Sequence, residues 1–270
     1  MVRTIIALFF CFPVALYAQT YQQLSERAID CIEKDSLPQA EELLLRALKL
    51  EPKNAKNALL FSNLGLVQRR LGEFDKALES YSFALNFAPL AVPILLDRAA
   101  IYMGKTDRAY TDYCQVLDGD KQNKEALLMR AYIYVLRRDY PAARIDYNRL
   151  LELDPQSYSG RLGLATLEQK EGKFREALAI LNKMIVEYPE DATLYIARAD
   201  VERDMKHEDL ALVDLEEAIR LDASSADAYL LRGNIYLVQK KKALAKSDFE
   251  KAISLGVPPA DLHEQLKQCR

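Results

Sequence analysis

The chain has 270 residues, of which half are apolar, and only nine glycines and ten prolines interrupt them. This composition favours a continuous core built from long helices. The formal net charge is −3 and no basic stripe follows the chain, which excludes nucleic acid as a partner.

The first eighteen residues have the layout of a secretory signal peptide. Arg3 is their only charged residue, residues 5–16 are almost wholly apolar, and Ala18 precedes a polar start at Gln19. The apolar run is too short for a membrane span, which needs about 20 residues. We expect cleavage near Ala18 and an exported protein, either periplasmic or secreted. The alternatives are an uncleaved anchor and a lipoprotein acylated at Cys11.

From residue 21 to residue 259 the sequence repeats itself about every thirty-four residues. The seven repeats span residues 21–54, 58–91, 92–123, 124–157, 158–191, 192–225 and 226–259. Position 8 is small in every repeat (Ala28, Gly65, Ala99, Ala131, Ala165, Ala199 and Gly233), and position 20 is always alanine if the third repeat lacks two residues in its turn. Two helices that cross closely need such small side chains where their axes meet. Position 24 is large throughout: Leu44, Tyr81, Tyr113, Tyr147, Leu181, Leu215 and Phe249.

This spacing resembles the tetratricopeptide repeat, a pair of antiparallel helices of thirty-four residues. The resemblance implies an all-α fold, a right-handed superhelical solenoid of antiparallel helix hairpins over residues 19–270, as one unbroken array. Residues 260–270 are expected to form a C-terminal capping helix. Pro38 and Pro141 fall where the second helix of a hairpin begins, so Ser36 and Asp139 are predicted to cap these helices.

The chain has no arrangement of residues that is typical of a catalytic site. Its two histidines, His207 and His263, lie about a repeat and a half apart, and no zinc-binding or nucleophile motif occurs. Residues 104–106 read Gly-Lys-Thr like the end of a phosphate-binding loop, but Ala99 stands where that loop needs its first glycine. The sequence therefore predicts a protein that is not an enzyme, holds no cofactor or metal and binds no small-molecule substrate.

The resemblance also implies a concave groove lined by the first helix of each hairpin. Ligand contacts in this family come from positions 2, 5, 9, 12 and 13, and position 5 is aliphatic from the third repeat onward. The predicted partner-binding residues are Leu96, Met103, Leu128, Tyr132, Leu162, Ile196, Asp200, Arg203 and Leu230. Such a row suits an amphipathic helix or an extended apolar segment. The alternative is that the position-5 residues are simply core.

The sequence thus predicts a non-enzymatic interaction scaffold, located in the cell envelope or secreted, that binds a protein or peptide segment in its groove. Any membrane association would be indirect. A subclass of the family grips acidic chaperone tails with lysine and asparagine, but Ser25 and Ile29 stand at those positions in the first repeat. Two alternative functions remain open. One is a structural subunit of a larger envelope complex, bound through its convex face or edges, and the other is an enzyme or its accessory part acting on an envelope polymer.

Overall fold

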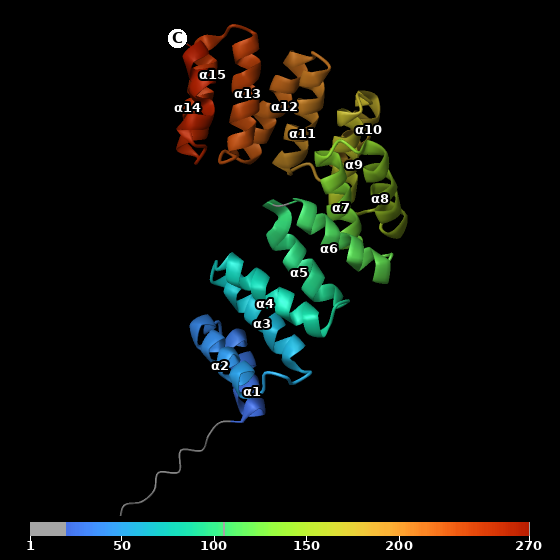
Figure 1. The fold of residues 1–270 in the computed structure, drawn as a ribbon. Helices are drawn as coiled ribbons and strands as arrows, with labels where there is room; N and C mark the ends of the chain where they lie inside the picture. Colours follow the sequence, from blue (N-terminus) through green and yellow to red (C-terminus); the bar gives the residue numbers. More distant parts are fainter. Residues whose placement is uncertain (1–19, 105, 270) are drawn as a thin grey trace, which may run out of the picture. The chain divides into compact units, whose positions relative to one another are not determined.

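The computed structural model describes residues 20–104 and 106–269, and within these ranges every regular element is helical (Figure 1). The predicted signal peptide lies outside the described residues. The contacts divide the chain into two compact units, the first ending at Asp120 and the second beginning at Lys121. The unbroken array expected from the sequence stays a prediction. Each unit is described here by itself.

Both units are built from antiparallel helix hairpins. The first unit contains α1 (Tyr21–Glu33) with α2 (Leu37–Leu50), α3 (Asn57–Arg70) with α4 (Phe74–Phe87), and α5 (Val92–Ile101), extended by η1 (Tyr102–Gly104), with α6 (Thr106–Gly119). The second unit contains α7 (Lys124–Leu136) with α8 (Tyr140–Leu153), α9 (Tyr158–Lys170) with α10 (Phe174–Glu187), α11 (Ala192–Asp204) with α12 (Glu208–Leu221), and α13 (Ala226–Val238) with α14 (Lys242–Ser254). It ends with η2 (Pro259–Leu262) and α15 (His263–Gln268).

The helices begin where the repeat spacing predicts, with one exception. The second repeat starts one residue early, at Asn57, whose buried side chain joins three segments of the chain. Its Nδ2 donates to the Glu51 carbonyl at 2.8 Å, and its Oδ1 accepts from the Tyr21 hydroxyl at 3.0 Å. These bonds hold the loop between the first two repeats in place, and α3 begins one residue earlier as a result. In the third repeat η1 extends the first helix to Gly104, and the second helix begins at Thr106.

The helix ends also follow the sequence, apart from one cap. Asp139 caps α8 by accepting the Ala142 amide at 3.2 Å, and Pro141 occupies the first turn. Ser36 precedes α2 in a similar backbone conformation but makes no side-chain cap bond, so the predicted cap is wrong there. Ser157 does cap α9, but its backbone is more extended, with ψ 109° against 63° at Ser36. In the conformation that Ser36 and Asp139 share, the longer carboxylate makes the bond and the hydroxyl does not.

The core of each hairpin lies where the small residues of positions 8 and 20 meet. All seven residues at each of these positions are buried. A Cβ atom added at Gly65 would lie 2.8 Å from the ring of Tyr81, and one added at Gly233 would lie 2.8 Å from the ring of Phe249. The predicted reason for small residues, close helix approach, is therefore confirmed.

A second feature of the core was not predicted from the sequence. In four hairpins an ion pair joins position 7 of the first helix to position 23 of the second. We call these pairs Arg–Asp braces, and they are Arg98–Asp112, Arg130–Asp146, Arg198–Asp214 and Arg232–Asp248. In each, two guanidinium nitrogens donate to the two carboxylate oxygens at 2.6–2.9 Å. A tyrosine ring lies 5.5–6.0 Å from every one of these guanidinium groups. The fifth repeat has Leu164 and Ile180 at the same positions.

The C-terminal tail packs against the last hairpin. Leu262 is buried, and Leu266 packs partly buried against the same apolar cluster as Phe249. His263 is exposed at the start of α15.

Candidate functional site

The aliphatic row at position 5 is half-buried throughout, neither fully exposed nor part of the closed core. In the second unit it runs over the first helices α7, α9, α11 and α13 as Leu128, Leu162, Ile196 and Leu230. The structure brings the last three together as lining of one open hollow of about 440 Å³, which we call the groove.

The other predicted site residues are placed in different surroundings. Leu96 and Met103 belong to the first unit, where both are half-buried. Tyr132 is exposed on α7, one turn beyond Leu128. Asp200 lines the groove, and Arg203, on the next turn of α11, forms an ion pair with Asp200.

The groove runs across α9, α11 and α13, and its two walls follow from helical spacing. Residues three, four and seven positions apart share a helix face, so positions 2, 5 and 9 form successive rows. The floor is the aliphatic position-5 row. One wall, toward the helix N-termini, contains Thr193 and Asp227. The opposite wall contains Thr166, Asp200 and Asn234, with Lys170 beyond them.

The charged residues of this opposite wall are largely paired with one another. Arg203 Nη2 lies 2.7 Å from Asp200 Oδ1 and 2.9 Å from Asp204 Oδ1. Gln169 of α9 donates through Nε2 to both carboxylates at 2.8 Å. Burial acts to raise the pKa of Asp204, but the bonds from Arg203 and Gln169 outweigh it and hold that pKa below its usual value. The cluster therefore joins α9 to α11 through hydrogen bonds and ion pairs among its own members.

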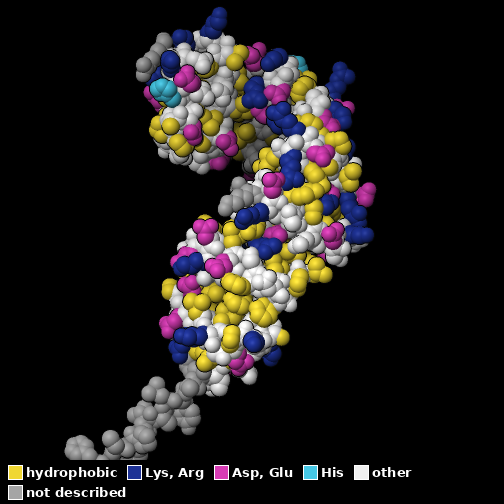
Figure 2. All heavy atoms as spheres, in the orientation of Figure 1, with side chains coloured by type: hydrophobic (Ala, Val, Ile, Leu, Met, Phe, Trp, Pro, Cys, Tyr) yellow, Lys and Arg dark blue, Asp and Glu magenta, His cyan; other side chains and the backbone are white. Residues whose placement is uncertain are grey.

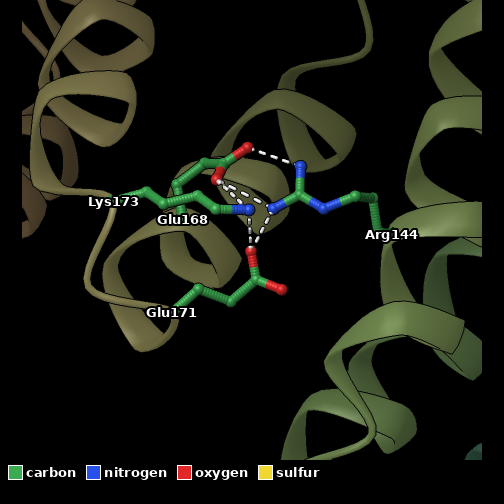
Figure 3. Close-up of polar contacts among 4 residues, drawn as sticks. All are labelled: Arg144, Glu168, Glu171 and Lys173. Atoms are coloured by element: carbon green, nitrogen blue, oxygen red, sulfur yellow. Dashed lines mark hydrogen bonds and ion pairs between the residues drawn. The ribbon is translucent and has the colours of Figure 1, made fainter.

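The C-terminal end of α9 is tied to its other neighbour as well (Figure 3). Arg144 of α8 donates to Glu168 through Nη1 at 2.6 Å and Nη2 at 2.8 Å, and it also contacts Glu171. Lys173 Nζ lies 2.7 Å from Glu171. Glu168 and its neighbour Gln169 thus point to α8 and to α11, so the helix that forms one end of the groove is held from both sides.

We expect the stabilising effect of Glu171 to disappear in acid. Its hydrogen bond to Lys173, and then that from Arg144, lowers the pKa of Glu171 below the value of the free side chain. A lowered folded-state pKa gives stability that is present above the unfolded pKa, about 4.5, and is lost as the pH falls through the folded one. Glu171→Gln should therefore lower the free energy of unfolding by up to about 1 kcal/mol at pH 7 and have no effect near pH 3.

Urea unfolding of both proteins across this pH range measures that difference. Glu176→Gln, an exposed change on α10, serves as the control and should show no such trend. A constant difference between the Glu171 variant and the parent from pH 7 to pH 3 would contradict the argument.

Among the described residues, no group of three or more His, Cys, Asp or Glu side chains is arranged to hold a metal ion. His207 is exposed, with Nδ1 at 2.7 Å from Glu202 Oε2. No helix in the described part of the chain has the length and apolar character needed to cross a membrane. On the face drawn in Figure 2, acidic and basic side chains are interspersed over both units.

One hollow was missed by the sequence reasoning. In the first unit an opening of about 890 Å³ lies between α1 and α3, with Ile29 and Leu59 on its lining. These side chains are 40% and 58% exposed. The position-5 residues of these two helices are Ser25 and Ser62, so the aliphatic signal that marks the later repeats is absent here.

Comparison with known proteins identifies relatives over most of the chain. Tetratricopeptide repeat family models match residues 98–158, 161–191 and 226–255. A tetratricopeptide repeat protein of known crystal structure from Parabacteroides merdae ATCC 43184 is 37% identical, with coverage of 93% of this chain and 99% of that one and a TM-score of 0.84. YrrB, a repeat protein with an unusual peptide-binding site, is 19% identical over 73% of this chain and 97% of its own, with a TM-score of 0.55, which shows a similar fold alone.

Curated relatives match a shorter part of the chain. Tetratricopeptide repeat protein 21A of Mus musculus is 27% identical over 156 residues, or 54% of this chain. The chain spans only 12% to 23% of the length of the curated relatives it matches.

Proposed function

The chain belongs to the tetratricopeptide repeat family, and from that premise we propose that it is an exported, non-catalytic scaffold that binds an extended segment of another protein in the groove across α9, α11 and α13. Solenoids of this family generally present extended surfaces to protein partners. The observation that carries the proposal is the row of half-buried aliphatic side chains Leu162, Ile196 and Leu230 on the floor of an open hollow between polar walls.

Such a floor favours contacts that form and dissociate readily. Covering its apolar area contributes roughly 25 cal/mol per Å², from which the cost of ordering the bound segment is subtracted. The floor itself is prepared for binding because α9 is already bonded to α8 and α11 through Glu168 and Gln169. Little of the binding free energy is then spent on arranging the protein.

Export is part of the proposal and rests on the sequence of residues 1–18. A single charged residue, an apolar stretch and a small residue at Ala18 support cleavage there and a periplasmic or secreted location. Expression of the full chain with a C-terminal tag tests this, because a mature N-terminus at Gln19 is expected. An intact N-terminus in the membrane fraction would contradict it.

A second function, a permanent structural subunit, is favoured by apolar residues on the second helices. Ile145 of α8, Val186 of α10 and Val213 of α12 are 67%, 82% and 63% exposed. A partner bound over these residues would leave the groove empty.

Paired variants separate the two functions. Leu162→Asp with Ile196→Asp places charge on the groove floor, whereas Ile145→Asp with Val213→Asp places the same charge on the second helices. Cross-linking of the tagged protein in cells, followed by mass spectrometry, measures the attached partner. We expect the amount of cross-linked partner to fall at least about 10-fold in the groove variant, since charges buried against an apolar segment are strongly unfavourable.

The control pair should retain its partner, and both variants should keep their helical circular dichroism. If the control pair loses the cross-linked partner and the groove pair retains it, the result would support the structural subunit instead. If the groove pair unfolds, Leu230→Ser provides a milder change of the same floor. Normal partner capture by that variant and normal stability would overturn the groove proposal.

A further inference from the structure

We infer the chemistry of the segment that binds in the groove, and this inference rests on the function proposed above. The segment is extended, and its aliphatic side chains contact the floor. It also carries a lysine or arginine that lies near the N-terminal ends of α11 and α13. The wall at those helix ends is acidic. A second hollow, of about 610 Å³, adjoins the groove there and shares Thr193 with it. Its lining includes Glu190, Asp191 and Asp222.

Two of these carboxylates are already engaged by the protein. Asp191 accepts from the Tyr158 hydroxyl at 2.6 Å and from the Thr193 amide at 2.9 Å. Asp222 accepts from the hydroxyl of Ser224 at 2.6 Å and from its amide at 2.9 Å. The bonds from the Ser224 hydroxyl and amide hold the pKa of Asp222 below its usual value, and both carboxylates hold their loops in place.

The other two carboxylates are directed to solvent. Glu190 and Asp227 are exposed, and within the described residues neither side chain makes a hydrogen bond or ion pair. Each lies beside the groove, the first in the adjoining hollow and the second on the groove wall itself. Arg220 is bonded to Glu217 at 2.6 Å and is also attracted electrostatically by Glu190. The N-terminal ends of α11 and α13 contribute roughly half a positive charge each, which leaves about three of the four carboxylate charges in excess.

The opposite wall has a different balance of charge. Lys170 is exposed there, and the carboxylates of Asp200 and Asp204 are bonded to Arg203 and Gln169. The groove is therefore negative on one side only. A segment that places a basic side chain on the acidic side gains attraction and a defined orientation, whereas an acidic side chain placed there is repelled.

Two labelled synthetic peptides test this inference on the mature chain. They share a central Leu-Ser-Leu-Ser-Leu stretch and differ only in having lysine or glutamate at both flanks. By fluorescence anisotropy at about 50 mM salt, we expect the lysine peptide to bind about 10-fold more tightly, and the preference to shrink toward about 0.5 M salt. Glu190→Gln with Asp227→Asn should remove most of the preference. Asp209→Asn with Glu216→Gln, an equal charge change at exposed residues of α12, should leave it unchanged.

The outcomes distinguish this inference from the function on which it rests. Equal binding of the two peptides, abolished in both by Leu162→Asp with Ile196→Asp, would overturn the charge preference and leave the groove standing. Tighter binding of the glutamate peptide would overturn it in the same way. Binding of neither peptide, or binding that the floor variant does not change, would overturn both proposals.

Discussion

Replacing Asp214 by alanine is expected to lower the free energy of unfolding by about 2–3 kcal/mol. Asp214 is 6% exposed and accepts from Arg198 Nε at 2.8 Å and Nη2 at 2.6 Å. The truncation leaves a guanidinium group in a partly buried position with Asn182 as its remaining side-chain hydrogen-bond partner. Breaking a fully buried pair costs about 3–5 kcal/mol, and we expect less because the Arg198 side chain is 26% exposed.

The fifth repeat suggests how to rescue this variant. Leu164 and Ile180 occupy the two brace positions there, so an apolar pair is compatible with the hairpin. Replacement of an ion pair by apolar residues of similar volume is often neutral. Arg198→Leu combined with Asp214→Ile should therefore recover at least half of the lost stability in urea unfolding.

The surface change Asp209→Asn controls for the loss of negative charge and should have an effect below about 0.5 kcal/mol. A double variant as unstable as the Asp214→Ala protein would show that the brace positions of this hairpin require the charges. The result bears on function as well, because Arg198 lies on α11 between the groove residues Ile196 and Asp200.

Most of the fold could be predicted because its determinants are local in the chain. Residue size at positions 8, 20 and 24 decides how one hairpin packs, and each hairpin lies within thirty-four residues. The Arg–Asp braces were visible too, as an arginine and an aspartate sixteen residues apart in three repeats, and fourteen apart where the turn is shortened. They were overlooked because charged residues on a helix are usually read as solvent-facing.

The site could be predicted only in outline. Helical periodicity puts Leu162, Ile196 and Leu230 on corresponding faces of three helices, but their exposure depends on how far apart these helices lie. The sequence suggested that Asp200 and Arg203 face a partner. Instead they pair with each other within α11. The bond that Asp200 accepts from Gln169, thirty-one residues earlier in the chain, depends on contact between neighbouring repeats. The acidic side of the groove likewise combines residues from two loops and the start of α13, which no single segment reveals.

The second large effect is expected at Gly65. Replacing it by alanine should destabilise the protein by about 1–3 kcal/mol. In a helix without such a close contact, alanine is more favourable than glycine by about 1 kcal/mol. An added Cβ would lie 2.8 Å from Cδ1 and Cε1 of Tyr81, whose ring is completely buried. The ring fills the space beside α3, so the two helices must move apart to admit the methyl group. Urea unfolding monitored by circular dichroism measures the loss.

The repeats themselves show the compatible combinations. Glycine at position 8 accompanies an aromatic residue at position 24 in the second and seventh repeats, and Ala165 and Ala199 accompany Leu181 and Leu215. In the third and fourth repeats alanine does stand with tyrosine, and the ring of Tyr147 there also lies against Gly163 of the next repeat. In a protein that already contains Tyr81→Leu, the change Gly65→Ala should therefore become stabilising, by up to about 1 kcal/mol, since the helix preference of alanine is no longer opposed. The four proteins form a double-mutant cycle, and this reversal of sign is its expected result. Destabilisation of equal size in both backgrounds would show instead that Gly65 is required by the backbone of α3 and not by the ring that faces it.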